Sequence, residues 1–225
     1  MKLFALFMAL ATSITTFAQT QALSQLVYEI RNPQTDSAHF RQALETIGQY
    51  LALNVQQELD TQEETIQTLT GAEAKHHLIS ETPVLVTILR AGLPLNAGVH
   101  KVFPNAEVGF LAMSRNEETL KAKTDYIALP KLENRTVILV DTMLATGGSL
   151  LDAIKIIEQG NPKKVFVISA IASAAGIDRI LQYDSSIKIF SAVVDPALNE
   201  KGYILPGLGD AGDRSYGLKH ITKMK

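Results

Sequence analysis

The sequence predicts an α/β fold, with a largely parallel central sheet flanked by helices. Short apolar runs rich in β-branched residues recur after Pro83, as is typical of strands buried on both faces. These runs span residues 84–89, 108–113, 137–140, 165–172 and 189–194. Helical stretches at 150–158 and 176–183 separate the later runs, so strands and helices alternate. Ligands of such sheets bind beyond the carboxyl ends of the strands, where we expect the functional site.

The composition limits the class of protein. With 225 residues, of which 46% are hydrophobic and 20% charged, the chain can bury a core and is too apolar for disorder. Lys and Arg total 21 against 23 Asp and Glu, a net charge of −2, so we expect no nucleic-acid partner. The chain has no cysteine, which excludes disulfide scaffolds, thiolate zinc sites and cysteine nucleophiles.

The N-terminus has the features of a targeting segment. After Met1-Lys2, the apolar stretch 3–11 precedes small residues at Thr16 and Ala18, a pattern that resembles a secretory signal peptide cleaved after Ala18. The stretch is too short to span a bilayer, so we expect no membrane partner. An N-terminal helix packed on the domain, or a misplaced start codon, is the alternative. We therefore divide the chain into a signal peptide or extension, 1–18, and one domain, 19–225.

The first long element after this segment is an amphipathic helix over residues 37–59. Its apolar side chains recur every three or four positions, at Phe40, Ala43, Leu44, Ile47, Leu51 and Val55. This spacing places an apolar stripe on the core, and Asp36 or Ser37 is expected to cap the helix. Farther on, His76 and His77 have no cysteine partner and no His-x-x-x-His spacing, so we expect a polar loop there rather than a metal site.

The strongest functional motif follows the third apolar run. The acid Asp141 comes after Val137-Ile138-Leu139-Val140, and a Thr-Gly-Gly-Ser turn at 146–149 then leads into a helix. Two adjacent glycines can turn backbone N–H groups toward a ligand at the positive end of that helix, which predicts a phosphate cradle. The motif is not a Walker A loop, because the lysine is missing. The alternative is a helix start capped by Thr146 or Ser149 in a protein that binds nothing there.

This segment resembles the phosphoribosyl pyrophosphate (PRPP) loop of type I phosphoribosyltransferases. The match runs from about residue 23 to residue 220 and narrows to the uracil phosphoribosyltransferase family. The resemblance implies a type I phosphoribosyltransferase fold, with a flexible arm and a C-terminal base-binding loop, over 19–225. It also assigns these residues to PRPP: Asp141, Thr142, Met143, Leu144, Ala145, Thr146, Gly147, Gly148 and Ser149.

Two arginines fall in further segments that resemble the family. Arg90, in Ile88-Leu89-Arg90-Ala91-Gly92-Leu93, matches the pyrophosphate loop, and its planar fork suits phosphate oxygens. Arg115 lies where 113–119 resembles the opening of the flexible arm, and Tyr126 and Pro130-Lys131 resemble the return of that arm. The alternatives are a surface ion pair at Arg90 and a passive polar loop in place of the arm.

The C-terminal stretch 195–214 resembles the family's base-binding loop. The resemblance assigns to uracil Tyr203, Ile204, Leu205, Gly207, Leu208 and Gly209, and to PRPP or a magnesium-bound water Asp210. Gly207-x-Gly209-x-x-Gly212 also fits a dinucleotide fingerprint, but Pro206 precedes it and too few residues follow for the helix and strand of such a unit.

The implied reaction displaces pyrophosphate from C1 of PRPP by N1 of uracil, giving UMP. Catalytic roles fall to Arg90, Arg115, Asp141 and Asp210, and Mg²⁺ is expected to be held through PRPP rather than by a protein metal site. The resemblance also implies a homo-oligomer, activation by GTP and, because PRPP and UMP are intracellular, a cytoplasmic enzyme. Export is the alternative that the signal-like start supports.

The chain departs from the family pattern at several positions. Thr142 stands where proline is usual, Leu53-Asn54 replaces Tyr-Glu, Gly217-Leu218 replaces Gly-Thr, and Ser173-Ala174-Ala175-Gly176 replaces Ser-Pro-Glu-Gly. These changes keep open two alternatives without turnover: a regulatory module that binds PRPP and a nucleotide, and an exported binding protein. A transferase acting on another pyrimidine is the nearest enzymatic alternative.

Overall fold

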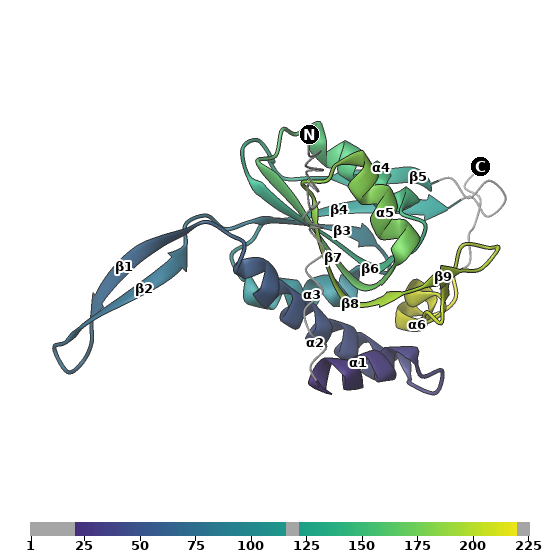
Figure 1. Ribbon diagram of the computed structural model, residues 1–225, viewed down its shortest axis with the longest axis horizontal. Coiled ribbons are helices and arrows are strands. Elements are labelled where there is room, and N and C mark those ends of the chain that lie inside the picture. Colours follow the sequence, from purple (N-terminus) through teal and green to yellow (C-terminus); the bar gives the residue numbers. More distant parts are fainter. Residues whose placement is uncertain (1–20, 116–121, 220–225) are drawn as a thin grey trace, which may run out of the picture.

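A six-stranded sheet organises the computed structural model, which describes residues 21–115 and 122–219 (Figure 1). The signal-like segment 1–18 and residues 116–119 of the predicted arm lie outside the described residues. The sheet order is β5-β4-β3-β6-β7-β8. Its strands are β3 (Val84–Leu89), β4 (Val108–Arg115), β5 (Ala122–Ala128), β6 (Thr136–Leu144), β7 (Lys164–Ser173) and β8 (Lys188–Asp195). Only β5 runs antiparallel to its neighbour among these strands, so the predicted α/β class is confirmed.

The sheet separates two hydrophobic cores because its central strands are apolar on both faces. Along β6, Ile138 and Val140 face one core, whereas Val137 and Leu139 face the other. The first core receives α1 (Gln21–Arg31), α2 (Ser37–Gln56) and α3 (Leu93–Val102), and the second receives α4 (Gly148–Glu158) and α5 (Ala174–Tyr183). Figure 1 shows these two helix groups on opposite sides of the sheet.

The helix α2 has the predicted stripe and cap. Asp36 is its N-cap, and the carboxylate accepts hydrogen bonds from the N–H groups of Ala38 and His39. The helix ends at Gln56, three residues before the predicted end. It packs closely on α3, because a Cβ on Gly98 would lie 1.8 Å from the carbonyl oxygen of Glu45. This close approach fixes α3, and with it the end of β3, against the first core.

A long hairpin projects from the body of the molecule between α2 and β3 (Figure 1). It pairs β1 (Thr61–Gln67) with β2 (Glu73–Ile79) in antiparallel register. His76 and His77 lie in β2, so the loop predicted there is wrong. Both histidines are exposed, and within residues 21–115 and 122–219 no cluster of three or more His, Asp or Glu could hold a metal ion. Those same residues include no helix long and apolar enough to cross a membrane.

The chain ends with short elements beside the carboxyl edge of the sheet. They are β9 (Ala197–Leu198), β10 (Ile204–Leu205) and α6 (Ala211–Tyr216), with β9 and β10 forming a two-stranded ribbon. Ile204, Leu208 and Ala211 bury their side chains in the first core. These contacts fix the segment beside the strand ends rather than leaving it as a free tail.

Candidate active site

A cavity of about 790 Å³ opens at the carboxyl edge of the parallel strands. Its walls come from the ends of β3, β4 and β6, from the turn 146–149, and from the C-terminal loop, defined here as residues 202–212. The position is the one expected for an open parallel sheet, where side chains and helix starts gather beyond the strand ends. Residues far apart in the sequence thus share one concave surface.

The turn 146–149, called the glycine turn below, forms one end of the cavity. Gly147 is the N-cap of α4 with φ +75°, and no side chain caps the helix start. The Thr146 or Ser149 cap considered above is therefore not formed. Uncapped N–H groups at a helix start carry partial positive charge and suit a phosphate. A Cβ on Gly147 would lie 3.1 Å from the carbonyl oxygen of Gly176, so another residue here would crowd that oxygen as well as strain φ.

The glycine turn rests on the start of α5. The Ser173 hydroxyl donates to the carbonyl oxygen of Ala145 (2.6 Å) and accepts from the N–H of Gly176 (2.9 Å). Arg179 donates to the carbonyl oxygen of Thr146 (3.2 Å). Ala174 and Ala175, where the family carries Pro-Glu, are exposed and do not line the cavity. The loss of that carboxylate therefore leaves the support of the turn in place.

Asp141 is the buried acid of the site. It lies within β6, which continues to Leu144, rather than beyond the strand end as the apolar run predicted. Burial raises the pKa of its carboxyl to about 7, and hydrogen bonds from the N–H groups of Thr142 and Met143 partly offset this rise. The ion pairs found among residues 21–115 and 122–219 do not include Asp141. Its carboxyl therefore faces the cavity with acceptor capacity for a ligand.

Arg90 joins the end of β3 to the C-terminal helix. Its guanidinium donates to the carboxylate of Asp213 (2.8 Å) and to the carbonyl oxygen of Gly217 (3.2 Å). The Leu89–Arg90 peptide bond is cis. Nearby, the Thr142 hydroxyl donates to the carbonyl oxygen of Ala91 (2.6 Å) and ties β6 to the same loop. Arg90 thus borders the cavity between the ends of β3 and α6.

The C-terminal loop forms the other end of the cavity. The side-chain oxygen of Asn199 accepts a hydrogen bond from the N–H of Tyr203 (2.9 Å), and the carbonyl oxygen of Tyr203 accepts one from the N–H of Asn199 (2.9 Å). Gly209, with φ +85°, and Asp210 then reach the cavity wall. Asp210 also caps α6 by accepting from the N–H of Asp213 (2.9 Å). The other oxygen of the Asp210 carboxylate lies 3.5 Å from the Lys219 ammonium.

The structure brings most of the predicted site residues together. Those that line the cavity are Arg90, Asp141, Met143, Tyr203, Gly209, Asp210 and residues 145–149. Arg115 is the last residue of β4, and its side chain lies outside the description.

Six predicted residues do not line the cavity: Thr142, Leu144, Ile204, Leu205, Gly207 and Leu208. Leu144, Ile204 and Leu208 are buried in the cores. For Leu144 in β6 and Ile204 in β10 this follows because alternate residues of a strand face inward. The Thr142 hydroxyl and both backbone polar groups of Gly207 form hydrogen bonds within the protein. The assignment of these six residues to ligands stays a prediction.

Sequence reasoning missed several residues of the site. Lys219 lines the cavity. Gly202 and Gly212 also line it, as do Ala112 and Met113 from β4. A lysine after the last helix carries no local signal of its role. Only the tertiary position of α6 brings Lys219 to Asp210.

Comparison with known proteins gives a consistent picture. The family model described as uracil phosphoribosyltransferase matches residues 17–218. A uracil phosphoribosyltransferase of Aquifex aeolicus is 41% identical over 186 residues, which cover 83% of this chain and 89% of the relative. One of Thermococcus gammatolerans is 36% identical over 210 residues, covering 91% and 93%. A solved protein structure from Aquifex aeolicus superposes with a TM-score of 0.83 at 37% identity, covering 89% of this chain and 97% of the other.

Proposed function

Because the chain belongs to the uracil phosphoribosyltransferase family, we propose that its cavity transfers the 5-phosphoribosyl group of PRPP to N1 of uracil. One observation carries the proposal: the glycine turn, the buried Asp141 and the C-terminal loop line one cavity. A phosphorylated sugar fits between an anion-binding helix start and a loop that offers backbone groups to a base. In the reaction, the bond from C1 to the pyrophosphate oxygen breaks and the bond from C1 to N1 forms. The N1 proton of uracil is released.

The glycine turn is the proposed seat of the 5′-phosphate. The helix start of α4 offers N–H groups that no side chain caps, and these donate to phosphate oxygens. Asp141 stands beside the turn and accepts hydrogen bonds from the ribose hydroxyls. Its carboxyl keeps capacity for these hydroxyls because, within the described part of the chain, the hydrogen bonds that act on it come from the backbone N–H groups of Thr142 and Met143.

The leaving pyrophosphate is assigned to the arginine side of the cavity. Arg90 and Arg115 offer delocalised positive charge that stabilises the charge developing on pyrophosphate in the transition state. Arg90 reaches the cavity while it pairs with Asp213. A ligand phosphate would compete for the same guanidinium donors.

The residues of the cavity fit a magnesium ion held chiefly by the substrate. The cavity is lined by three carboxylates, those of Asp125, Asp141 and Asp210, and the described residues form no cluster of three or more side chains that could hold a metal ion. Mg²⁺ commonly takes one or two carboxylates and completes its shell with phosphates and water. When bound, the ion neutralises charge on the pyrophosphate.

The C-terminal loop is the proposed base site. Gly209 brings its backbone to the cavity, and the loop's N–H and C=O groups can pair with the two carbonyls and the N3–H of uracil. Cytosine presents an acceptor in place of that N3–H and would leave a buried carbonyl unpaired, which is a strong basis for discrimination. Asp210, at the boundary between loop and sugar, is the proposed acceptor of the N1 proton. Full turnover by Asp210→Asn would refute that last role.

The deciding experiment measures UMP formation by purified residues 19–225 with PRPP and Mg²⁺. Uracil, cytosine and orotate are supplied in parallel reactions. The proposal expects UMP from uracil alone. PRPP binding by the folded protein without product from any base would instead support a regulatory or exported binding protein. Product from another pyrimidine would move the specificity assignment.

We further propose a homo-oligomer, GTP activation and a cytoplasmic location. The exposed hairpin β1–β2 supports an oligomer, since it offers Ile66, Leu69 and Leu78 to solvent. Family resemblance supports GTP, and the intracellular occurrence of PRPP supports the cytoplasm over export through residues 1–18. Light scattering, turnover with added GTP and cell fractionation of the full chain test these three points in turn.

A further inference from the structure

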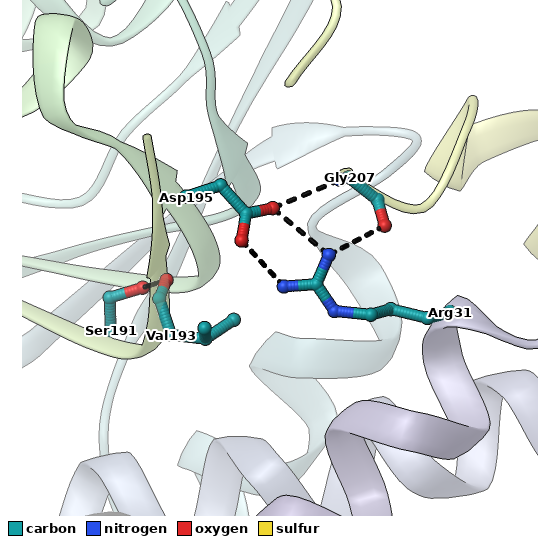
Figure 2. Close-up of polar contacts among 5 residues, drawn as sticks. All are labelled: Arg31, Ser191, Val193, Asp195 and Gly207. Carbon is teal, nitrogen blue, oxygen red and sulfur yellow. Dashed lines mark hydrogen bonds and ion pairs between the residues drawn. The ribbon is translucent and has the colours of Figure 1, made fainter. Parts of the chain in front are cut away.

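Arg31 and Asp195 form a buried clamp around Gly207 (Figure 2). Arg31 is the last residue of α1, and Asp195 is the last residue of β8. The guanidinium binds both oxygens of the Asp195 carboxylate, at 2.6 and 3.0 Å, and donates to the carbonyl oxygen of Gly207 at 3.0 Å. The N–H of Gly207 donates to the same carboxylate (2.9 Å). Both backbone polar groups of Gly207 are therefore held by one ion pair.

Burying the two charges of the clamp carries a desolvation cost. The Asp195 side chain is 4% exposed and that of Arg31 22%, so both charges have lost most of their water. A buried ion pair adds little net stability, but removal of one partner strands the other charge. Planar bidentate pairing also fixes the direction of the guanidinium. The pair therefore defines a position more than it adds stability.

The position that it defines is the turn of the C-terminal loop. Gly207 has φ +60°, and a Cβ there would lie 2.1 Å from the carbonyl oxygen of Ile204. The next carbonyl oxygen, of Leu208, accepts from Arg214 (3.0 Å), which also donates to the carbonyl oxygen of Asn32 (2.7 Å). The carbonyl oxygens of Gly207 and Leu208 thus accept from two arginines: Arg31 at the end of α1, and Arg214 of α6, which also binds the residue that follows α1. The two residues that follow, Gly209 and Asp210, line the cavity.

We propose that Arg31 and Asp195 are positioning residues for the base-binding end of the site. Neither residue lines the cavity. They fix Gly207 so that the backbone of Gly209 meets the base at the correct height and angle. The inference rests on the proposed function and adds two residues to it: Asp195, which opens the stretch 195–214, and Arg31, which no local motif marks. Their loss is expected to act mainly on uracil. PRPP should be largely unaffected, because the glycine turn is on another element and Asp210 keeps its own contacts with the N–H of Asp213 and with Lys219.

Two variants test the clamp by steady-state kinetics with each substrate varied in turn. Arg31→Lys keeps the charge but lacks the planar fork that reaches Asp195 and Gly207 together. Asp195→Asn keeps the shape but replaces one acceptor oxygen by a donor. Each variant is expected to raise KM for uracil about tenfold, with KM for PRPP changed less than about twofold. The matched control is Arg135→Lys, whose side chain is 23% exposed and pairs with Glu107 away from the cavity. It should change neither constant.

The outcomes separate the possible failures. No UMP from the unmodified chain refutes the proposed function itself. UMP from the unmodified chain together with an unchanged KM for uracil in Arg31→Lys refutes the clamp. A purely structural role would lower kcat through loss of folded enzyme, or raise both KM values equally, and either result also refutes it.

Hydrogen exchange tests the clamp even if neither variant folds. In the unmodified, ligand-free chain, peptides covering 203–210 should exchange as slowly as the end of β8, because the N–H of Gly207 is bonded to a buried carboxylate. In a folded Arg31→Lys, that stretch should exchange faster while the glycine turn is unchanged. Exchange of 203–210 at the rate of the exposed hairpin in the unmodified chain would refute a preformed loop.

Discussion

Asp141 and Asp195 are two buried carboxylates near the carboxyl ends of strands in one sheet, and the protein treats them differently. Asp195 is 3% exposed and receives a guanidinium and a backbone N–H. Asp141 is 8% exposed and accepts hydrogen bonds from backbone N–H groups, and burial raises the pKa of its carboxyl to about 7. One carboxylate holds the C-terminal loop, and the other is the one that we propose binds the ribose. Burial alone therefore does not distinguish the two acids, whereas the lack of a cation partner among residues 21–115 and 122–219 does.

The largest effect should come from Asp141→Asn in the ligand-free protein. Below pH 4 the carboxyl is protonated in both the folded and unfolded states. Between pH 4 and 7 only the unfolded state is ionised, so the stability of the unmodified chain falls as pH rises through the raised pKa. From pH 4 to pH 7, the free energy of unfolding of the variant minus that of the unmodified chain should therefore increase by at most about 4 kcal/mol.

Urea unfolding at pH 4, 5.5, 7 and 8.5 measures this difference, with an unchanged m-value as the check that the unfolded states are alike. A difference that is flat with pH would show that Asp141 has a hidden cation, and the contrast with Asp195 would fail.

The second effect concerns the base end. Gly207→Ala places a Cβ at 2.1 Å from the carbonyl oxygen of Ile204, which forces the C-terminal loop to shift. We expect UMP formation at low uracil to fall about 100-fold, since displacement of a site by about 1 Å has that order of cost. Gly71→Ala is the control: Gly71 has φ +82°, but nothing lies within 4 Å of its Cβ position. Equal kinetic losses in both variants would attribute the effect to backbone strain rather than to the loop.

The phosphate end gives the next effect. Gly147→Ala combines φ +75° with a Cβ 3.1 Å from the carbonyl oxygen of Gly176. Because this contact is looser than the one at Gly207, we expect KM for PRPP to rise about tenfold and KM for uracil to change little. Initial rates with each substrate varied in turn measure both constants. A larger change for uracil than for PRPP would reverse our assignment of the two ends.

The smallest effect should come from the support of the glycine turn. Ser173→Ala removes the hydroxyl that caps α5 and bonds to the carbonyl oxygen of Ala145. The expected loss is about 1 kcal/mol of unfolding free energy, as for other N-caps, with KM for PRPP raised about twofold. Thermal unfolding and PRPP titration measure the two quantities. If stability drops while KM is unchanged, the turn does not depend on α5 for its shape.

Much of the fold could be predicted because apolar runs mark buried parallel strands. Five of the six strands of the main sheet follow from such runs. The edge strand β5 could not be predicted in this way, because its sequence is polar and its apolar residues Tyr126 and Ile127 are exposed. The hairpin β1–β2 has almost no apolar pattern, because its residues are exposed or half-buried. Its strands are defined by their pairing with each other rather than by burial.

The two ends of the site differ in the same way. The glycine turn depends on neighbours in sequence, so its glycines and Asp141 are visible as one motif. The form of the C-terminal loop depends on Arg31, which lies 176 positions from Gly207, and on Arg214 with its contact to Asn32. Sequence marks the loop itself but not the partners that hold it. The pairing of Arg31 with Asp195 exists only after the whole sheet is in place.

The clamp also sets an order of events during synthesis. Ala145 and Ser173 are only 28 positions apart in the sequence. The hydrogen bond between them, which supports the glycine turn, can therefore form while the chain is still being made. Arg31, made early, must wait until Gly207 emerges before its last hydrogen bond can form. A chain cut short before residue 195 therefore keeps the glycine turn proposed for phosphate and lacks the loop proposed for the base. On the proposed assignment, choice of the base is the last property that this protein acquires as it is made.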